Sequence, residues 1–370
     1  MGSPQETLLS AIDQAALKGM DILTKDLAQL TPNQLANGAT LRDVPIVIQN
    51  NNVQPIVNRL DALRSGVNVV PVVAHVPSEG YAAGDDTKEL GNYISMGPLF
   101  FSGVGKQGIV STFPGYHYNT KGFGAFGDVN IGQEDAILGV AFTHNHSTVK
   151  NDNGTSIVQM QSPQGALYGN INYGNQDLEG IIYLEGIFSY GRTLNRSRRY
   201  VNFLDEVATA KYWSQQMFGR AQLGFMPYAD LFEVSPFVLW QDSLVKLNAF
   251  KESGAPISNL QVSGNKVDTA SAGAGLKIAY VQYKSTWLPE IHFKFMRDFK
   301  VTKLNVTSQF LLGGPVFSTF APPAQKNSIN TGFSITAGFT ESFEMTAGYD
   351  FDLKGKFSSH SGAVRLRWKF

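Results

Sequence analysis

Two histidines near the end of an alternating segment are the first residues whose types could do chemistry. In the run THNHS, His144 and His146 stand two residues apart, so both side chains would share one face of a strand. A plausible register of the preceding segment brings His117 alongside, and three imidazoles can bind a transition metal. The position close to a loop favours solvated rim residues instead. We therefore predict no metal site and no cofactor.

Glu185 and Arg220 form a second candidate pair. They fall on consecutive alternating segments and have the same facing parity, so opposite charges would meet. An enzyme would need a nucleophile, a base and a group that orients the base. We find no such set around this pair, and we interpret it as a structural ion pair.

The segments that carry these residues alternate with a period of two, which indicates β-strands. The last nine residues, GAVRLRWKF, show the pattern most clearly. One face would carry large apolar side chains, and the other would carry Arg365, Arg367 and Lys369. The apolar set is Val364, Leu366, Trp368 and Phe370. One face of this strand suits lipid and the other suits water.

Twelve such segments can be counted, and they cover most of the chain after residue 93. They are 94–104, 115–131, 134–149, 156–173, 177–193, 207–226, 230–244, 269–283, 286–300, 327–340, 342–354 and 360–370. Several are long enough to cross a bilayer, which takes about 9 to 11 residues of tilted strand. Strands of soluble sandwiches are usually shorter, about 5 or 6 residues.

The connections between these segments alternate in length. Every second connection is a tight turn, such as IGQE or YAD, whereas the longest are 194–206, 245–268 and 301–326. Short turns on one side and long loops on the other are typical of outer-membrane β-barrels. Because an open sheet edge in lipid would leave backbone groups unpaired, we expect the first strand to pair with the last.

Composition excludes several other classes. The chain has 370 residues, with 30 basic and 30 acidic side chains and no cysteine, so neither a nucleic-acid footprint nor a disulfide framework is predicted. No run of 18 apolar residues predicts a transmembrane helix. The start, MGSPQ, resembles a cloning scar and lacks the features of a signal peptide, so any native one is expected to be absent.

The region before residue 93 has helical periodicity. Apolar residues spaced by three and four run from Leu9 to Leu30. A second helix is predicted in VQPIVNRLDALRSG, where Pro55 suits the first turn and Gly66 the C-terminal cap. Its apolar stripe is thin, and such a helix requires a mostly polar container.

Several segments together resemble the C-terminal translocator domain of autotransporters, the type V secretion proteins. The run SPFVLWQDSLVKLNAFKESGAPISNLQV resembles that family's P…F-x-E-x-G-A…L-x-V pattern after the seventh strand. TKGFGAFGDVNI with LGVAFTHNHSTV is similar to its second hairpin, LAQLTPNQLANGA to its pre-barrel segment and VNRLDALRSG to its pore helix. The linker from Val67 to Asn92 is longer than the family pattern suggests.

The resemblance implies an all-β transmembrane barrel of 12 antiparallel strands with an N-terminal α-helical segment plugging the pore. The implied organisation is a scar and helical linker or passenger end at 1–37, an extended linker at 38–53, a pore helix at 54–66, a linker at 67–92 and the barrel at 93–370. Such a domain inserts in the bacterial outer membrane and mediates secretion and surface display of its own N-terminal passenger. Implied partners are outer-membrane lipid and lipopolysaccharide, the β-barrel assembly machinery, periplasmic chaperones and the passenger. A monomer is expected.

The same resemblance and strand parity assign roles to individual residues. The predicted pore lining is Glu185, Arg220, Gln222, Lys277, Lys294, Glu344, Asp350, Asp352, Arg365 and Arg367. The plug helix would use Ile56, Asn58, Arg59, Leu60, Leu63 and Arg64. The terminal set Val364, Leu366, Trp368 and Phe370 resembles the assembly signal. The basic run NRSRRY at 195–200 is predicted to be a solvated loop, with contact to lipopolysaccharide phosphates as the alternative.

Self-cleavage is a further possibility that the resemblance raises. Some autotransporters cut themselves between two asparagines, and QNNNVQP places Asn50, Asn51 and Asn52 just before the predicted pore helix. An Asn side-chain amide can attack its own backbone carbonyl to form a succinimide; helix capping is the competing interpretation.

Beyond a translocator, two functions stay open: a diffusion porin, and an outer-membrane hydrolase that would use the histidines at the rim.

Overall fold

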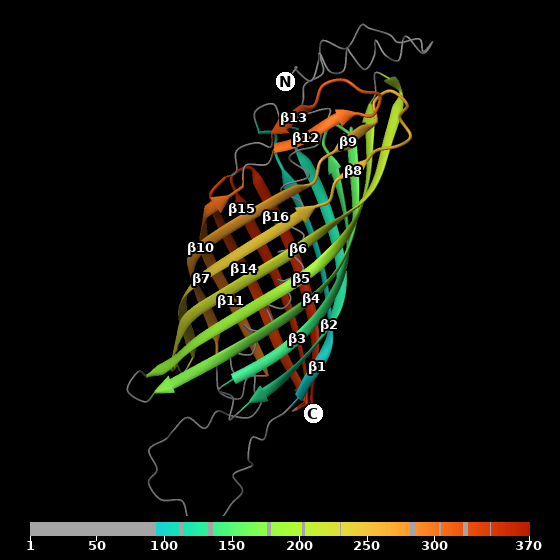
Figure 1. Ribbon diagram of the computed structural model, residues 1–370. Coiled ribbons are helices and arrows are strands. Elements are labelled where there is room, and N and C mark those ends of the chain that lie inside the picture. Colours follow the sequence, from blue (N-terminus) through green and yellow to red (C-terminus); the bar gives the residue numbers. More distant parts are fainter. Residues whose placement is uncertain are drawn as a thin grey trace, which may run out of the picture.

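The computed structural model contains a closed barrel of antiparallel strands that all tilt the same way (Figure 1). The structure describes residues 94–110, 114–131, 136–175, 179–201, 204–229, 231–281, 286–302, 305–320, 325–340 and 342–370. The predicted segments 1–37, 38–53, 54–66 and 67–92 therefore lie outside the described residues. None of the described residues forms a helix long and apolar enough to cross a membrane.

Each of the twelve predicted segments is a strand of this barrel. In chain order they are β1 Ile94–Gln107, β2 Tyr116–Ile131, β3 Ala136–Asn151, β4 Ser156–Asn175, β5 Gly180–Val201, β6 Glu206–Pro227, β7 Phe232–Leu247, β10 Asn265–Tyr280, β11 Trp287–Val301, β14 Asn327–Thr340, β15 Phe343–Lys354 and β16 Phe357–Lys369. The barrel order follows the chain order, so every neighbour in sequence is a neighbour in space.

The barrel closes between its first and last strands, as the sequence predicts. The pairing of β1 with β16 runs from Ser95 opposite Lys369 to Gln107 opposite Phe357. At the very end, the Phe370 amide donates to the Ile94 carbonyl at 2.9 Å. Both ends of the barrel sequence therefore lie at one rim, which is the lower rim in Figure 1.

Two of the predicted long loops are largely folded. The connection after β7 contains β8 Phe250–Lys251 and β9 Leu260–Val262, and the connection after β11 contains β12 Asn305–Phe310 and β13 Phe317–Phe320. These short strands form a separate sheet in the order β13-β12-β9-β8 at the upper end of the barrel (Figure 1). We call this sheet and its loops the outer cap.

The third predicted long loop, 194–206, was wrong. Strands β5 and β6 continue into it, with 22 residues each, and Val201 pairs with Glu206. The run 195–200 is therefore strand rather than loop. Its Arg199 is buried, whereas Arg196 and Arg198 are exposed.

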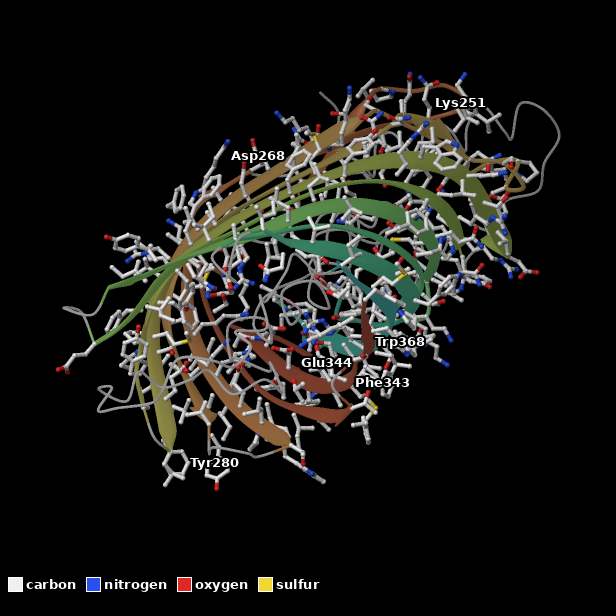
Figure 2. All side chains as sticks on the ribbon, turned by 90° about the horizontal axis from the view of Figure 1, so that it is seen from below. Lys251, Asp268, Tyr280, Phe343, Glu344 and Trp368 are labelled. Atoms are coloured by element: carbon white, nitrogen blue, oxygen red, sulfur yellow. The ribbon has the colours of Figure 1, made fainter. Side chains whose placement is uncertain are left out.

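Burial alternates along the strands and separates an outer apolar face from an inner face. Outward positions expose large apolar side chains; Phe123, for example, keeps 57% of its surface accessible. In Figure 2, Phe343 and Trp368 point away from the barrel while Glu344 points into it. Their rings lie 4.9 Å apart, and Phe232 and Tyr280 form a similar pair at 5.5 Å. Aromatic side chains thus gather at the rim that contains the chain end.

A charge on the outward face should prevent assembly. We expect Val364→Arg to reduce the folded, membrane-inserted fraction strongly, because an Arg facing lipid near mid-bilayer costs about 2 to 4 kcal/mol. The matched control is Arg365→Gln on the inward face, where Arg367 still pairs with Glu344. Heat-modifiable mobility of membrane extracts on gels measures the folded fraction. Equal losses in the two variants would contradict the assignment of faces.

Candidate functional site in the barrel interior and outer cap

One side of the barrel interior carries an ionic network. Glu344 on β15 accepts a hydrogen bond from Arg367 of β16 at 3.0 Å and forms an ion pair with Arg365 at 3.7 Å. Arg365 also donates to the Thr346 hydroxyl at 2.7 Å. All three charged side chains are at least 95% buried. Such buried charges persist because each has an oppositely charged or hydrogen-bonding partner.

A second network continues from these strands to β11 and β10. The Nε2 atom of His292 lies 3.0 Å from Asp350 and 2.9 Å from the Asn330 side-chain oxygen. Asn330 in turn donates to Asp352 at 2.8 Å. Lys277 of β10 lies opposite His292, and it forms an ion pair at 3.2 Å with Glu290, two residues before His292 on β11. We call the inner face of β10, β11, β14, β15 and β16 the charged wall.

The opposite side of the interior holds an apolar patch, with the buried carboxylates of Asp128 and Glu185 among its inward neighbours. Side chains from β1 to β6 form one buried cluster there. Its members are Leu99, Phe101, Phe126, Ala141, Ala166, Tyr168, Ile187 and Phe218. The sequence predicts a polar inner wall, and this cluster corrects that expectation. The interior thus has two chemically different sides, and we call this cluster the apolar patch.

All ten residues of the predicted pore lining lie on the inward parity of their strands. Seven are buried, and Arg220, Lys294 and Asp352 are half-buried. Seven of the ten belong to β10, β11, β15 or β16, two belong to β6, and Glu185 belongs to β5. The register places Glu185 opposite Gln222 and Arg220 opposite Ile187, and Arg220 donates to the Gln222 side-chain oxygen at 2.5 Å.

The proposed triple-histidine cluster is wrong in its register. His117 on β2 pairs with Lys150, whereas His146 pairs with Lys121, four residues further along β2. His117 instead contacts Asp152 at 3.1 Å. Within the described ranges, no group of three His, Cys, Asp or Glu side chains could hold a metal ion.

The outer cap is fixed to the barrel by a buried ion pair that the sequence pattern did not predict. Arg199 of β5 donates through Nε to Glu252 Oε1 at 3.1 Å and through Nη2 to Oε2 at 2.5 Å. The same guanidinium donates to the Ser258 carbonyl at 2.6 Å, and Glu252 accepts the Leu260 amide at 2.9 Å. A bidentate Arg–carboxylate pair fixes geometry as well as charge. A prediction of β5 that extended to Arg199 would have placed this side chain on the inward face, and that position is the signal in the sequence that points to a buried arginine.

A second carboxylate and a glycine shape the same loop. Glu206, the first residue of β6, accepts the Ile257 and Ser258 amides at 3.0 Å each and the Ser258 hydroxyl at 2.6 Å. Gly254 has φ of +96°, and a side chain there would meet the Val207 carbonyl at 2.8 Å. Only glycine fits this left-handed, closely packed position. The E-x-G-A part of the motif therefore has a structural role.

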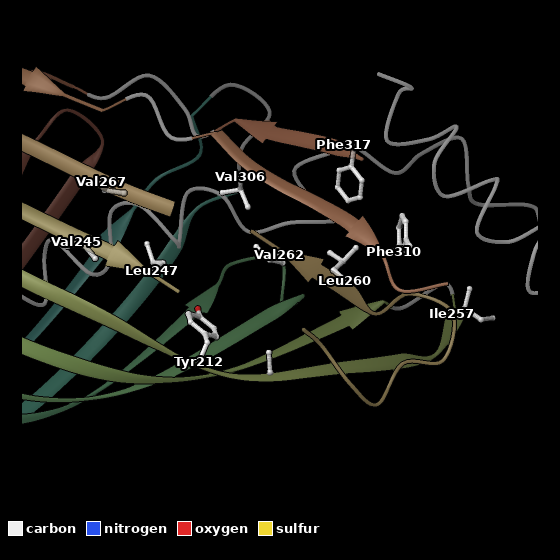
Figure 3. Close-up of a cluster of buried hydrophobic side chains, with 11 residues drawn as sticks. Tyr212, Val245, Leu247, Ile257, Leu260, Val262, Val267, Val306, Phe310 and Phe317 are labelled. Carbon is white, nitrogen blue, oxygen red and sulfur yellow. The ribbon is translucent and has the colours of Figure 1, made fainter. Parts of the chain in front are cut away.

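An apolar core joins the outer cap to the barrel strands beneath it (Figure 3). Tyr212 of β6 stacks on Phe250 of β8, with ring centroids 4.1 Å apart. The buried members are Ala210, Tyr212, Val245, Leu247, Ile257, Leu260, Val262, Val267, Val306, Phe310 and Phe317. Because these residues come from barrel strands and from both folded connections, the cap and the barrel share one apolar core.

Comparisons with known proteins identify the family. A model of the autotransporter beta-domain family matches residues 100–350, which is more than half of the chain. The chain belongs to the autotransporter β-domain family. This translocator domain is a protein of the bacterial outer membrane.

Similar proteins agree with this assignment. Outer membrane protein A of Rickettsia rickettsii is 26% identical over 87% of this chain, which corresponds to 14% of that protein. Outer membrane protein B of Rickettsia prowazekii is 23% identical over 98% of this chain and 22% of that protein. The chain thus spans less than a quarter of the length of these curated relatives. The translocator domain of autotransporter NalP from Neisseria meningitidis shares the fold, with a TM-score of 0.62 and 17% identity, covering 92% of this chain and 100% of that one.

Removal of the Glu252 charge should loosen the cap of the translocator. We expect Glu252→Gln to destabilise it by about 3 to 5 kcal/mol, because Arg199 is left buried without its anion. Limited proteolysis of the folded protein in detergent measures cleavage within 248–264. The control is Lys251→Gln, since Lys251 is exposed on the same short strand. A double replacement, Arg199→Met with Glu252→Leu, should restore resistance, and equal cleavage of all variants would remove this role from the pair.

Proposed function

We propose that the translocator carries its own N-terminal passenger across the outer membrane and afterwards retains residues 54–66 as a helix inside the barrel. The observation that supports this most is the two-sided interior. A helix with a thin apolar stripe needs one apolar and one polar neighbour. The apolar patch and the charged wall offer these on opposite sides of one lumen.

The predicted helix matches both sides in residue type. Ile56, Leu60 and Leu63 form its stripe and would pack on the apolar patch. Arg59 and Arg64 flank the stripe and would approach the carboxylates of the charged wall. The six predicted plug residues lie outside the described part of the chain, so this placement rests on complementarity.

Assembly is the second part of the proposal. Val364, Leu366, Trp368 and Phe370 lie on the outward parity of β16 and its end, and Phe370 keeps 73% of its surface exposed. We propose that the assembly machinery reads this terminal strand after periplasmic chaperones have delivered the chain. The same strand then closes the barrel against β1, so recognition and closure would use one segment in succession.

The single-channel conductance tests the plug. In planar bilayers we expect the whole chain to give a small or flickering conductance, because the helix fills the lumen. A chain that begins at Gly66 should give a large, steady conductance. A chain that begins at Gly38, which keeps the helix, is the matched control and should behave like the whole chain. A large conductance of the whole chain would place the helix outside the lumen and favour a diffusion porin.

Self-cleavage is proposed separately for Asn50, Asn51 or Asn52, which also lie outside the described residues. Succinimide formation at one of them would release everything before it from the barrel. Intact mass measured during incubation of the folded protein should then show a new chain that starts within 51–53. Replacement of all three by Ala should abolish the break, because Ala has no side-chain amide. An intact wild-type chain after prolonged incubation would contradict the proposal.

A further inference from the structure

The outward face of strands β1 to β6 is divided into two zones. Toward the rim that holds the chain end, its positions are apolar, with Leu138, Val140, Leu167 and Phe188 among the most exposed. Toward the outer cap, the same face becomes cationic. Its basic residues are Lys106, His117, Lys121, His144, His146, Lys150, Arg192, Arg196, Arg198 and Lys211. No Asp or Glu occupies an outward position on these six strands.

The strand register brings part of this basic zone into a row. Lys106 of β1 lies opposite His117 of β2, which lies opposite Lys150 of β3. On the other side, Lys106 lies opposite Ser358 of β16. Neighbouring strands are about 4.8 Å apart, so three basic side chains follow one another on one surface within about 10 Å.

This row lines an open groove of about 410 Å³ on the outside of the barrel. Val104, Thr148 and His360 complete its lower wall, so the groove borders the apolar zone. His117 contacts the exposed carboxylate of Asp152, which lies in the turn beyond β3. Among the residues that the structure describes, neither Lys106 nor Lys150 has a hydrogen-bonding or ionic partner.

Lys106 and Lys150 lie two strands apart with His117 between them, and an anion in the groove would reduce the repulsion between the two lysine charges. On the other half of the barrel, two outward lysines have a carboxylate of the chain itself close to them. There Lys300 pairs with Asp268 at 2.7 Å, and Lys266 approaches the same carboxylate at 4.0 Å. Among the described residues, the ion pair of the β1 to β3 row joins His117 to Asp152 and leaves both lysines without a carboxylate partner.

The height of the groove matches the level of lipid headgroups. Trp368 belongs to the aromatic rim near the chain end, and Ser358, ten residues earlier on β16, lies beside Lys106. Ten residues of strand span about 33 Å, which a tilt of about 40° reduces to about 25 Å along the barrel axis. The apolar band of outer-membrane barrels is about 25 Å tall. The basic row thus lies just above the opposite edge of that band.

We propose that this groove binds the phosphate-bearing headgroup of an outer-leaflet lipid, with Lys106 and Lys150 as the phosphate ligands and Val104 against the lipid's apolar part. The inference rests on the outer-membrane assignment and on a cap that faces outward. It does not depend on the plug helix.

Native mass spectrometry of the folded whole chain in zwitterionic detergent tests the proposal, with bisphosphorylated lipid A as the probe. We expect Lys106→Gln with Lys150→Gln to weaken binding about tenfold or more, since each tenfold corresponds to ~1.4 kcal/mol. The matched control is Lys246→Gln with Lys266→Gln, two exposed outward lysines on β7 and β10. This control should bind like the wild type.

A second arm needs no substitution and so does not depend on folding of a variant. Wild-type protein should bind dephosphorylated lipid A much more weakly, and inorganic phosphate at the lipid concentration should not displace the bound lipid. Equal binding by the test and control variants, equal binding of dephosphorylated lipid A, or displacement by inorganic phosphate would each overturn the proposal. If the protein binds lipid A but its conductance is the same with and without residues 1–65, the lipid-binding groove is supported and only the pore helix is rejected.

Discussion

The pairing of β1 with β16 is the constraint on which the rest of this structure depends. Inside a bilayer no water can satisfy an exposed backbone amide or carbonyl, and each unpaired group costs several kcal/mol. Closure removes both sheet edges at once. It also forces an even number of strands with both ends at one rim, and it gives every strand one face toward lipid and one toward the interior. The difference in polarity between the two faces of each strand is therefore a consequence of closure.

Closure also determines which charges meet inside. Because β16 is held between β15 and β1, Arg365 and Arg367 face Glu344 on one side, and the Arg365 guanidinium lies 5.9 Å from the Phe126 ring centroid on the other. A carboxylate shared by two arginines is costly to desolvate, and its contribution to stability is small compared with the cost of removing one member. The same strand whose outward side chains resemble an assembly signal thus places the arginines that join the charged wall to the apolar side. One segment connects the two halves of the lumen.

The sequence predicts the twelve strands well because alternation is a local property that lipid and water impose on every residue of a spanning strand. The ends of β5 and β6 were harder to predict. Beyond the bilayer both faces of these strands are polar or covered by protein, so the run 195–200 looks like a basic loop. The expected register between β2 and β3 was also wrong by several residues at His117. A shift by an even number of residues leaves all three histidines on the outward face, so side-chain parity alone could not reveal the error. The cap could not be derived locally, since Arg199 and Glu252 are 53 residues apart in sequence.

The length of β5 and β6 and the presence of the cap have a common physical reason. Each has 22 residues, about twice what a tilted strand needs to cross a bilayer, so half of each stands above the membrane. There the outward face is exposed to water and carries Arg196, Arg198 and Lys211. The inward face, with Tyr212, is apolar and must be covered by other side chains. The connections after β7 and β11 supply it, and Arg199 with Glu252 fixes their position. Because its sheet joins these two connections, the cap can form only after the strands from β5 to β11 are in place.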